Sequence, residues 1–166
     1  MKASEQEIIF KRWMKHHQGL IFKVLQTYCD QHQDREDLFQ EITLQLWRSI
    51  PNFKGKSKET TWIYRVALNA ALQFRRSEKK RRGRLSLLDM RHTLLQVHAR
   101  IHNGELEWLH TEIRKLGKID RSLILLHLEG MSYQEMADIL GISETNVGVK
   151  LNRIKARLTN VAREIR

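Results

Sequence analysis

The sequence has 166 residues and a formal net charge of +11 at pH 7, with 41% hydrophobic and 30% charged residues. That length fits one domain or two small ones, and the positive excess favours a polyanionic partner. The sequence contains no signal-peptide pattern and no apolar run that could cross a bilayer, so we expect a cytoplasmic protein without membrane insertion. The single cysteine, Cys29, excludes an intrachain disulfide and fits a reducing compartment.

Apolar residues recur at helical spacing along most of the chain, which contains one proline and little glycine. We therefore predict an all-α fold of two small helical domains joined by a linker. Residues Glu5 to Asp30 are predicted to form two amphipathic helical stretches with a break or bend at Gly19.

The segment from Asp34 to Ile50 is predicted to be an acidic helix with Asp34 as its N-cap. Between Asp30 and Ile50 there are five acidic and two basic residues, a net charge of −3. Phosphates would repel such a helix, so it is a poor DNA contact. Its outward side chains form either a solvated face or a protein-docking face, and the residues alone favour neither. These outward residues include Asp37, Gln40 and Glu41.

A basic loop with aromatic residues follows Pro51, and Thr60 or Thr61 is predicted to cap the next helix. Lysines alternate here with rings such as Phe53 and Trp62, a pattern typical of single-stranded nucleic-acid sites. The alternative is that Trp62 belongs to the core, as aromatic residues at helical spacing usually do.

Residues 75–84 hold seven basic residues against one acidic residue and are predicted to contact phosphates, with Arg75 and Arg76 at their start. The following residues, 85–103, are too apolar for a flexible tether. His98 and His102 have the i,i+4 spacing of a metal pair. Because no cysteine or paired acid lies nearby, we expect no metal site.

Residues 131–158 have the pattern of a helix-turn-helix. Ser132 and Glu135 are spaced as a capping box, Gly141 suits the turn, and Ser143 can cap the second helix. Residues 143–166 carry a net charge of +4, from six basic and two acidic residues, whereas residues 103–142 carry −3, from four basic and seven acidic residues. The positive charge of this half therefore lies on the helix that would enter a major groove.

Periodicity divides the second helix into two faces. Val147, Leu151, Ile154 and Leu158 are predicted to face inward. The residues predicted to contact DNA are Thr145, Asn146, Val149, Lys150, Asn152 and Arg153. An ordinary helical hairpin with a solvated basic face is the alternative.

Three segments resemble, in order and spacing, the sigma-70 family of RNA polymerase sigma factors, in the extracytoplasmic-function class that keeps only regions 2 and 4. DREDLFQEI from Asp34 is similar to the family's D-A-E-D-L-V-Q-E-V helix. WIYRVALN from Trp62 resembles W-L-x-x-I-A-x-N, and GMSYQEMA from Gly130 resembles G-x-S-Y-x-E-I-A. The resemblance implies region 2 at 1–82, a linker at 83–104 and region 4 at 105–166.

The resemblance also implies partners. The acidic helix would dock on the clamp helices of core RNA polymerase through Asp37, Gln40 and Glu41, and the flap of the polymerase is a further expected contact. Unpaired bases of the −10 promoter element would bind Phe53, Lys56, Trp62 and Asn69, with Arg75 and Arg76 alongside. The recognition helix would bind the −35 element, and the linker would lie in the RNA-exit path. Many relatives are held inactive by an anti-sigma factor, which this sequence neither shows nor excludes.

An autonomous helix-turn-helix regulator is the alternative function, but it leaves the acidic helix and the lysine-aromatic loop unused. An enzyme is disfavoured because no nucleophile-base motif or cluster of carboxylates and histidines is present. We therefore expect no catalytic residue, metal or cofactor.

Overall fold

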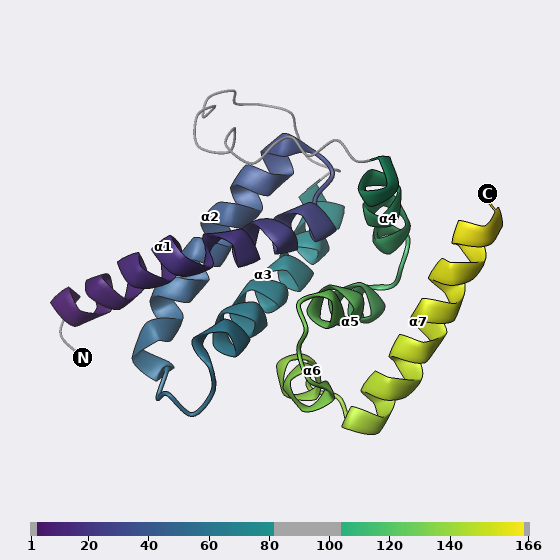
Figure 1. Cartoon of the computed structure of the whole chain (residues 1–166). Coiled ribbons are helices and arrows are strands. Elements are labelled where there is room, and N and C mark those ends of the chain that lie inside the picture. Colours follow the sequence, from purple (N-terminus) through teal and green to yellow (C-terminus); the bar gives the residue numbers. More distant parts are fainter. Residues whose placement is uncertain (1–2, 82–103, 165–166) are drawn as a thin grey trace.

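The computed structural model describes residues 3–81 and 104–164, with side chains described over 4–74 and 108–163. Every regular element in these ranges is a helix, so the all-α prediction is confirmed (Figure 1). The elements are α1 (Ala3–Tyr28), α2 (His32–Ser49), the 3-10 turn η1 (Ile50–Asn52), α3 (Glu59–Arg81), α4 (Gly104–Arg114), α5 (Lys118–Leu128), α6 (Tyr133–Leu140) and α7 (Glu144–Glu164). The predicted linker, with His98 and His102, lies outside the described residues except for Gly104, which is the first residue of α4.

Helices α1, α2 and α3 pack on one another and form the N-terminal lobe, residues 3–81. The prediction of a break at Gly19 is wrong, because α1 is one continuous helix. Gly19 is exposed, while Leu20 and Ile21 directly after it are buried. Burial of those side chains outweighs the cost of about 1 kcal/mol that a glycine imposes within a helix.

The predicted starts of two helices in this lobe are also wrong. Helix α2 begins at His32, so Asp34 lies in its first turn and Gln31 is the N-cap residue. Arg35 Nε donates to the Cys29 carbonyl at 3.0 Å, which ties this first turn to the end of α1. Helix α3 begins at Glu59, so neither predicted threonine is its cap. The predicted inward stripe of α2 is confirmed, because Leu38, Ile42 and Leu46 are buried.

Helices α4 to α7 form the C-terminal lobe, residues 104–164. Its capping box is confirmed: Glu135 N donates to Ser132 Oγ at 3.1 Å, and Ser132 N donates to Glu135 Oε2 at 2.9 Å. Gly141 ends α6 with φ of +68°, a left-handed conformation that only glycine adopts at low cost. The helix-turn-helix prediction is therefore correct in its capping and its turn.

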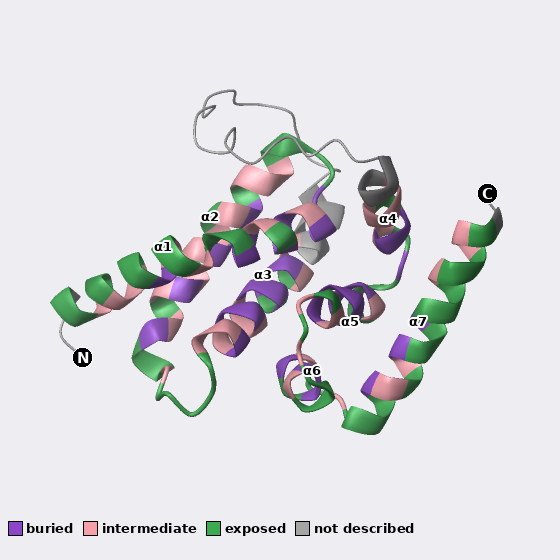
Figure 2. Ribbon diagram, in the orientation of Figure 1, coloured by how far each residue is buried: buried purple, intermediate pink, exposed green. Residues whose placement is uncertain are grey.

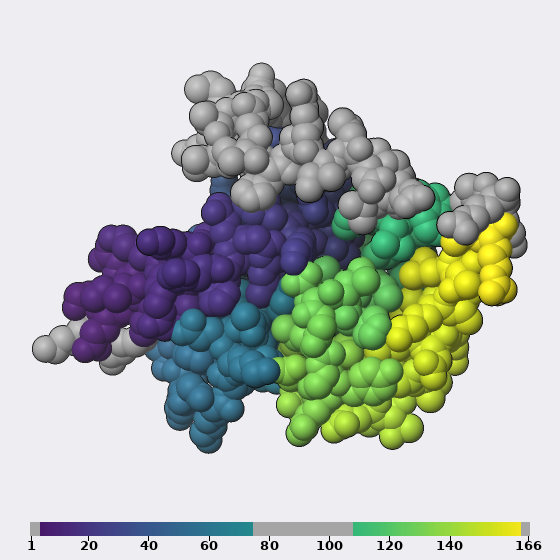
Figure 3. All heavy atoms as spheres, viewed as in Figure 1, coloured from purple at the N-terminus to yellow at the C-terminus, as the bar shows by residue number. Residues whose placement is uncertain are grey.

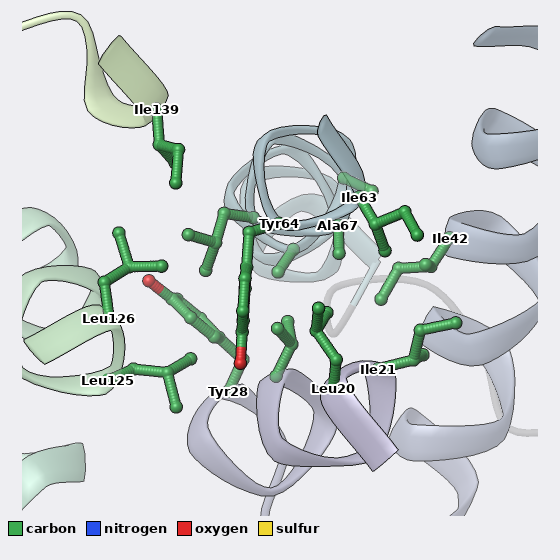
Figure 4. Close-up of a cluster of buried hydrophobic side chains, with 14 of the residues drawn as sticks. Leu20, Ile21, Tyr28, Ile42, Ile63, Tyr64, Ala67, Leu125, Leu126 and Ile139 are labelled. Atoms are coloured by element: carbon green, nitrogen blue, oxygen red, sulfur yellow. The ribbon is translucent and has the colours of Figure 1, made fainter. Parts of the chain in front are cut away.

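The two lobes pack against each other, as Figure 3 shows for the purple and blue helices beside the green ones. Six successive residues of α5, from Arg121 to Leu126, are buried, although a helix lying on a surface would expose one side. Helix α5 is enclosed because α6 and α7 cover one side and α1 covers another (Figure 2). Tyr28 and Tyr64 meet Leu125, Leu126 and Ile139 in one continuous core (Figure 4).

Candidate protein and nucleic-acid interfaces

Helix α7 has the two faces that its sequence predicts. Ser143 Oγ accepts from Asn146 N at 3.2 Å, so the predicted cap is present. Val147, Leu151 and Ile154 are buried against α5 and α6, and Leu158 packs at their edge. Gly148 lies between the two faces, where an added Cβ would be 3.4 Å from the Tyr133 ring. A small residue at this position therefore lets α6 and α7 approach closely.

The opposite face of α7 is open to solvent. Five of the predicted −35 residues are exposed: Thr145, Asn146, Val149, Asn152 and Arg153. The sixth, Lys150, is half-buried, and its Nζ lies 3.0 Å from Asp120 Oδ1 of α5. A phosphate at Lys150 must therefore compete with a carboxylate, while Arg153 has no such ion pair among the described residues. This exposed, polar and basic surface has the shape and chemistry of a major-groove reader.

The predicted −10 residues Phe53 and Trp62 belong to an aromatic cluster. The Phe53 ring centroid lies 5.3 Å from that of Trp13 and 5.6 Å from that of Trp62. Trp62 Nε1 donates to Ser49 Oγ at 3.1 Å, and both rings remain partly exposed. Trp13 is 1% exposed, and its contact with this loop was not predicted from the sequence. The two interpretations of Trp62, core and nucleic-acid contact, are thus compatible with one position.

Glu59, the first residue of α3, joins this loop to α1. Its carboxylate is ion-paired with Arg12, and His17 Nε2 lies 3.4 Å from Glu59 Oε2. Partial burial raises the pKa of Glu59, but the neighbouring Trp13, His17 and Arg12 side chains together outweigh it and leave this pKa below its ordinary value. Lys56, in the loop before α3, is exposed.

A stripe formed by Lys58, directly before α3, and by residues of α3 carries the predicted residues Trp62 and Asn69 together with two residues that were not predicted from the sequence. Lys58, Trp62, Arg65 and Asn69 recur at i, i+4, i+7 and i+11 and so share a face, which we call the α3 stripe. Lys58 Nζ lies 2.9 Å from Glu135 Oε1, and an Arg65 guanidinium nitrogen donates to the Asp138 carbonyl at 2.5 Å. Arg75 and Arg76 lie farther along α3, where side chains are not described.

The outward side of α2 carries the predicted docking residues. Asp37 and Gln40 are exposed, and Glu41 is half-buried and accepts from Gln45 Nε2 at 2.8 Å. Leu44 shares their face by helical spacing and is 42% exposed. Leu44 was not among the residues predicted from the sequence, although its position off the buried stripe of α2 was a usable signal. We call Asp37, Gln40, Glu41 and Leu44 the acidic face.

The described residues were also examined for a metal site, a membrane-spanning helix and a reactive cysteine. Among residues 3–81 and 104–164, no group of three histidine, cysteine or acidic side chains is placed to hold a metal ion. None of the helices described there is long and apolar enough to cross a membrane. Cys29 is buried, with its thiol 3.6 Å from the Asp34 carbonyl.

A helix-turn-helix lobe with an exposed basic face, next to a lobe that joins an acidic face to a lysine-aromatic loop, defines a two-part DNA-binding protein of all-α fold. The family model for sigma-70 region 2 matches residues 13–81, and the model for sigma-70 region 4 matches residues 106–158. These matches cover most of the chain in the order found in sigma factors. The chain belongs to the sigma-70 family, in its extracytoplasmic-function class.

Curated relatives agree with this family assignment, and solved structures agree with the fold. The chain is 25% identical to the ECF RNA polymerase sigma-E factor of Haemophilus influenzae, over 91% of this chain and 86% of that protein. It is 27% identical to the ECF sigma factor SigX of Bacillus subtilis, over 83% of this chain and 75% of that one. Its fold is similar to that of CnrH, solved in complex with the cytosolic domain of CnrY. The TM-score is 0.68 and the identity 19%, over 95% of this chain and 90% of that one. Its fold is also similar to that of the sigma factor RpoE of Bartonella quintana, solved in complex with the anti-sigma factor NepR. The TM-score is 0.67 and the identity 17%, over 95% of this chain and 98% of that one.

As a member of this family, the protein is a sigma factor that directs transcription initiation, and it has no catalytic activity of its own. Sigma factors bind core RNA polymerase and promoter DNA, and region 4 binds DNA through its helix-turn-helix.

Proposed function

We propose that this sigma factor divides its work among three surfaces: the acidic face of α2, the lysine-aromatic loop with the α3 stripe, and the exposed face of α7. The proposed boundaries are region 2 at residues 1–82, a linker at 83–104 and region 4 at 105–166. The protein acts in the cytoplasm, where core RNA polymerase and promoter DNA are found.

The acidic face binds the clamp helices of core RNA polymerase. Asp37, Gln40 and Glu41 supply charge and hydrogen bonds, and phosphates would repel them. Leu44 supplies the apolar contact, because an exposed leucine surrounded by polar groups loses water when a partner covers it. The flap of the polymerase is a further contact.

The lysine-aromatic loop and the α3 stripe bind the −10 element as an unpaired strand. Phe53 and Trp62 offer partly exposed rings: Phe53 packs on Trp13, and Trp62 packs on Phe53 and donates to Ser49, so both positions are fixed before a base stacks on them. Lys56 and Asn69 are exposed for contacts with phosphates and base edges. Arg75 and Arg76 extend the same helix with positive charge.

Helix α7 binds the −35 element as duplex DNA. Asn146, Asn152 and Arg153 are residue types that recognise base edges, and Thr145 and Val149 suit apolar contacts with thymine methyl groups. Lys150 binds phosphate in competition with Asp120. The observation that carries the whole proposal is this exposed polar face opposite a fully buried stripe, on a helix with net positive charge.

An anti-sigma factor is a further partner that we propose for this chain. The structure of the Bartonella quintana relative contains an anti-sigma factor, and CnrH was solved with the cytosolic domain of CnrY. The similar fold of this chain makes the same kind of complex geometrically available.

Run-off transcription tests the proposal. Core RNA polymerase is incubated with and without the protein on a pool of genomic promoter fragments, and transcript starts are mapped. We expect new discrete starts that share −35 and −10 sequences. The absence of core binding and of starts, together with tight binding to intact duplex, would instead indicate an autonomous helix-turn-helix regulator.

A further inference from the structure

Helix α1 contacts both ends of the lysine-aromatic loop, which occupies residues 53–58 between η1 and α3. At the start of the loop, the ring centroid of the buried Trp13 lies 5.3 Å from that of Phe53. At its end, Glu59 is ion-paired with Arg12, and His17 lies beside the same carboxylate. Side chains from two successive turns of α1 therefore anchor the loop at both ends.

Glu59 has a partner on each of its two carboxylate oxygens. The Arg12 guanidinium pairs with Oε1, and His17 Nε2 lies 3.4 Å from Oε2. Because Glu59 is the first residue of α3, these contacts tie the point where the loop ends to α1. Two partners also restrict rotation of the carboxylate, so the junction has one preferred geometry.

This ion pair is better suited to fixing a position than to stabilising the fold. The Arg12 side chain is 51% exposed and that of Glu59 is 31% exposed, so water screens their attraction. Pairs of this kind contribute little to the free energy of unfolding. Removing the pair should therefore leave the N-terminal lobe folded while it frees one end of the loop.

Between the two anchors the chain is open to solvent. Residues 54–58 are all exposed, and Lys54 and Lys56 are among them. Gly55 has φ of +69°, a left-handed conformation that glycine adopts at low cost, so the chain turns between the anchors. Ordering the backbone of one free residue lowers a binding constant by about tenfold. A loop that is anchored at both ends avoids much of this cost when it binds a strand.

We propose that Glu59 is a positioning residue of the −10 site. Paired with Arg12, it fixes the loop so that Lys54 and Lys56 bind phosphates of the unpaired strand. Glu59 acts through the loop and contacts neither base nor phosphate itself. This inference rests on the proposed assignment of the loop to the −10 element. Both anchors lie within the N-terminal lobe, so they do not depend on contacts with the other lobe.

The sign of a mutational effect separates positioning from simple electrostatics. Glu59 places a negative charge beside a loop that binds phosphates, so on charge alone Glu59→Gln should tighten DNA binding. If the carboxylate positions the loop, the same substitution should weaken binding, because the freed loop must be ordered again on the strand. The two roles therefore predict opposite changes in affinity.

The experiment uses holoenzyme assembled from core polymerase and the full chain. The probe is a labelled DNA from a promoter found by run-off transcription, double-stranded over the −35 element and single-stranded over the −10 element. Anisotropy at several salt concentrations gives the affinity and its salt dependence. For Glu59→Gln we expect about tenfold weaker binding. The slope of log affinity against log salt should also become shallower by about 0.7 for each phosphate contact that is lost.

Two further variants complete the design. Glu7→Gln is the matched control, because it also removes an ion-paired carboxylate from the N-terminal lobe, where Glu7 pairs with Lys11 within α1. It should bind as the wild type does, with an unchanged salt slope. Arg12→Gln breaks the proposed pair from its other side and should weaken binding. The Arg12→Gln, Glu59→Gln double variant should bind no more weakly than the weaker single variant, because both changes break one interaction.

Two results would overturn the inference. Unchanged or tighter binding by Glu59→Gln would mean that this carboxylate does not position the loop. Additive losses in the double variant would mean that Arg12 and Glu59 act independently. Lys56→Gln keeps this test distinct from the proposed function. If Lys56→Gln weakens binding and Glu59→Gln does not, only the present inference fails, whereas unchanged binding by both would also remove the assignment of the loop to the −10 element.

Discussion

The two surfaces proposed to bind DNA differ in how far the rest of the molecule occupies them. The outer face of α7 is open, and Lys150 is its one proposed residue with an ion pair among the described residues. The α3 stripe is occupied: Trp62 packs on Phe53, and Lys58 and Arg65 bind α6. The packed rings fit the proposed ligand, because duplex DNA presents a regular groove whereas unpaired bases need rings held in fixed positions. The contacts of Lys58 and Arg65 follow instead from the packing of the two lobes.

The first prediction addresses the aromatic cluster and has the largest expected effect. Trp13→Ala removes a fully buried ring that supports Phe53, and we expect the free energy of unfolding to fall by about 3–5 kcal/mol. Urea denaturation followed by circular dichroism measures it. Val149→Ala is the control in the other lobe: that side chain is 53% exposed, and its removal should change stability by less than about 0.5 kcal/mol. Equal losses in the two variants would contradict the contrast between the lobes.

The second prediction separates DNA recognition from polymerase docking. Arg153→Ala should weaken binding of the assembled holoenzyme to a −35 fragment by about 1–3 kcal/mol, because an exposed arginine loses its base or phosphate contact. Glu41→Ala should weaken core binding and leave the −35 affinity of the assembled holoenzyme unchanged. Fluorescence anisotropy with labelled DNA and with labelled core measures the two affinities. If both substitutions reduced DNA affinity alike, the division of surfaces would be wrong.

A third prediction concerns the acidic face. Leu44→Gln should weaken core binding by about 1 kcal/mol, or about fivefold, because an apolar contact is replaced by a polar side chain that retains water. Ile8→Gln is the matched control, since Ile8 is also an exposed aliphatic residue of the N-terminal lobe, at 66%, and lies outside the acidic face. Titration of labelled core measures both. Equal weakening of core binding by the two substitutions would mean that Leu44 makes no specific contact with core polymerase.

The smallest expected effect is a dependence of stability on pH in the C-terminal lobe. Burial is the main cause that lowers the pKa of His110 and of His127 below 6.5, and repulsion by Arg114 and by Lys155, respectively, adds to it. At a pH between the lowered and the ordinary pKa, the unfolded chain therefore binds more protons than the folded chain. The contribution of these two histidines to the free energy of unfolding is therefore fully present above the ordinary pKa. It is lost progressively as the pH drops through about 6.5.

Thermal unfolding between about pH 7.5 and 5.5 measures this dependence. The double variant His110→Gln, His127→Gln should lose part of it. An unchanged slope in that variant would assign the dependence to other groups.

The sequence was sufficient where structure is set locally. The Ser132–Glu135 capping box, the Gly141 turn and the two faces of α7 each depend on residues within a few turns, so periodicity and capping rules identified them. The sequence failed at Gly19, at Asp34 and at the two threonines predicted to cap α3, because tertiary packing joined or lengthened helices whose boundaries the local signals had placed elsewhere.

The contact between the lobes was not predictable from any single segment. Ile139 is off the apolar stripe of α6 and Arg121 is charged, so neither looks like a core residue until the other lobe is in place. The same holds for Trp13, which is close to Phe53 in space but far from it in sequence. Residues such as Asp37 and Arg153 could be selected as candidates, since charge and exposure follow from periodicity, although their partners had to come from the resemblance to a family.

The central claim is that the −10 and −35 elements are bound by different lobes, one as single strand and one as duplex. Permanganate footprinting of holoenzyme on one promoter tests it, because permanganate modifies unpaired thymines, and a nuclease footprint over the −35 element is read in parallel. We predict that Trp62→Ala abolishes the reactive thymines and keeps the −35 footprint, whereas Arg153→Ala weakens the −35 footprint first. Loss of both signals together in both variants, with core binding intact, would contradict the account.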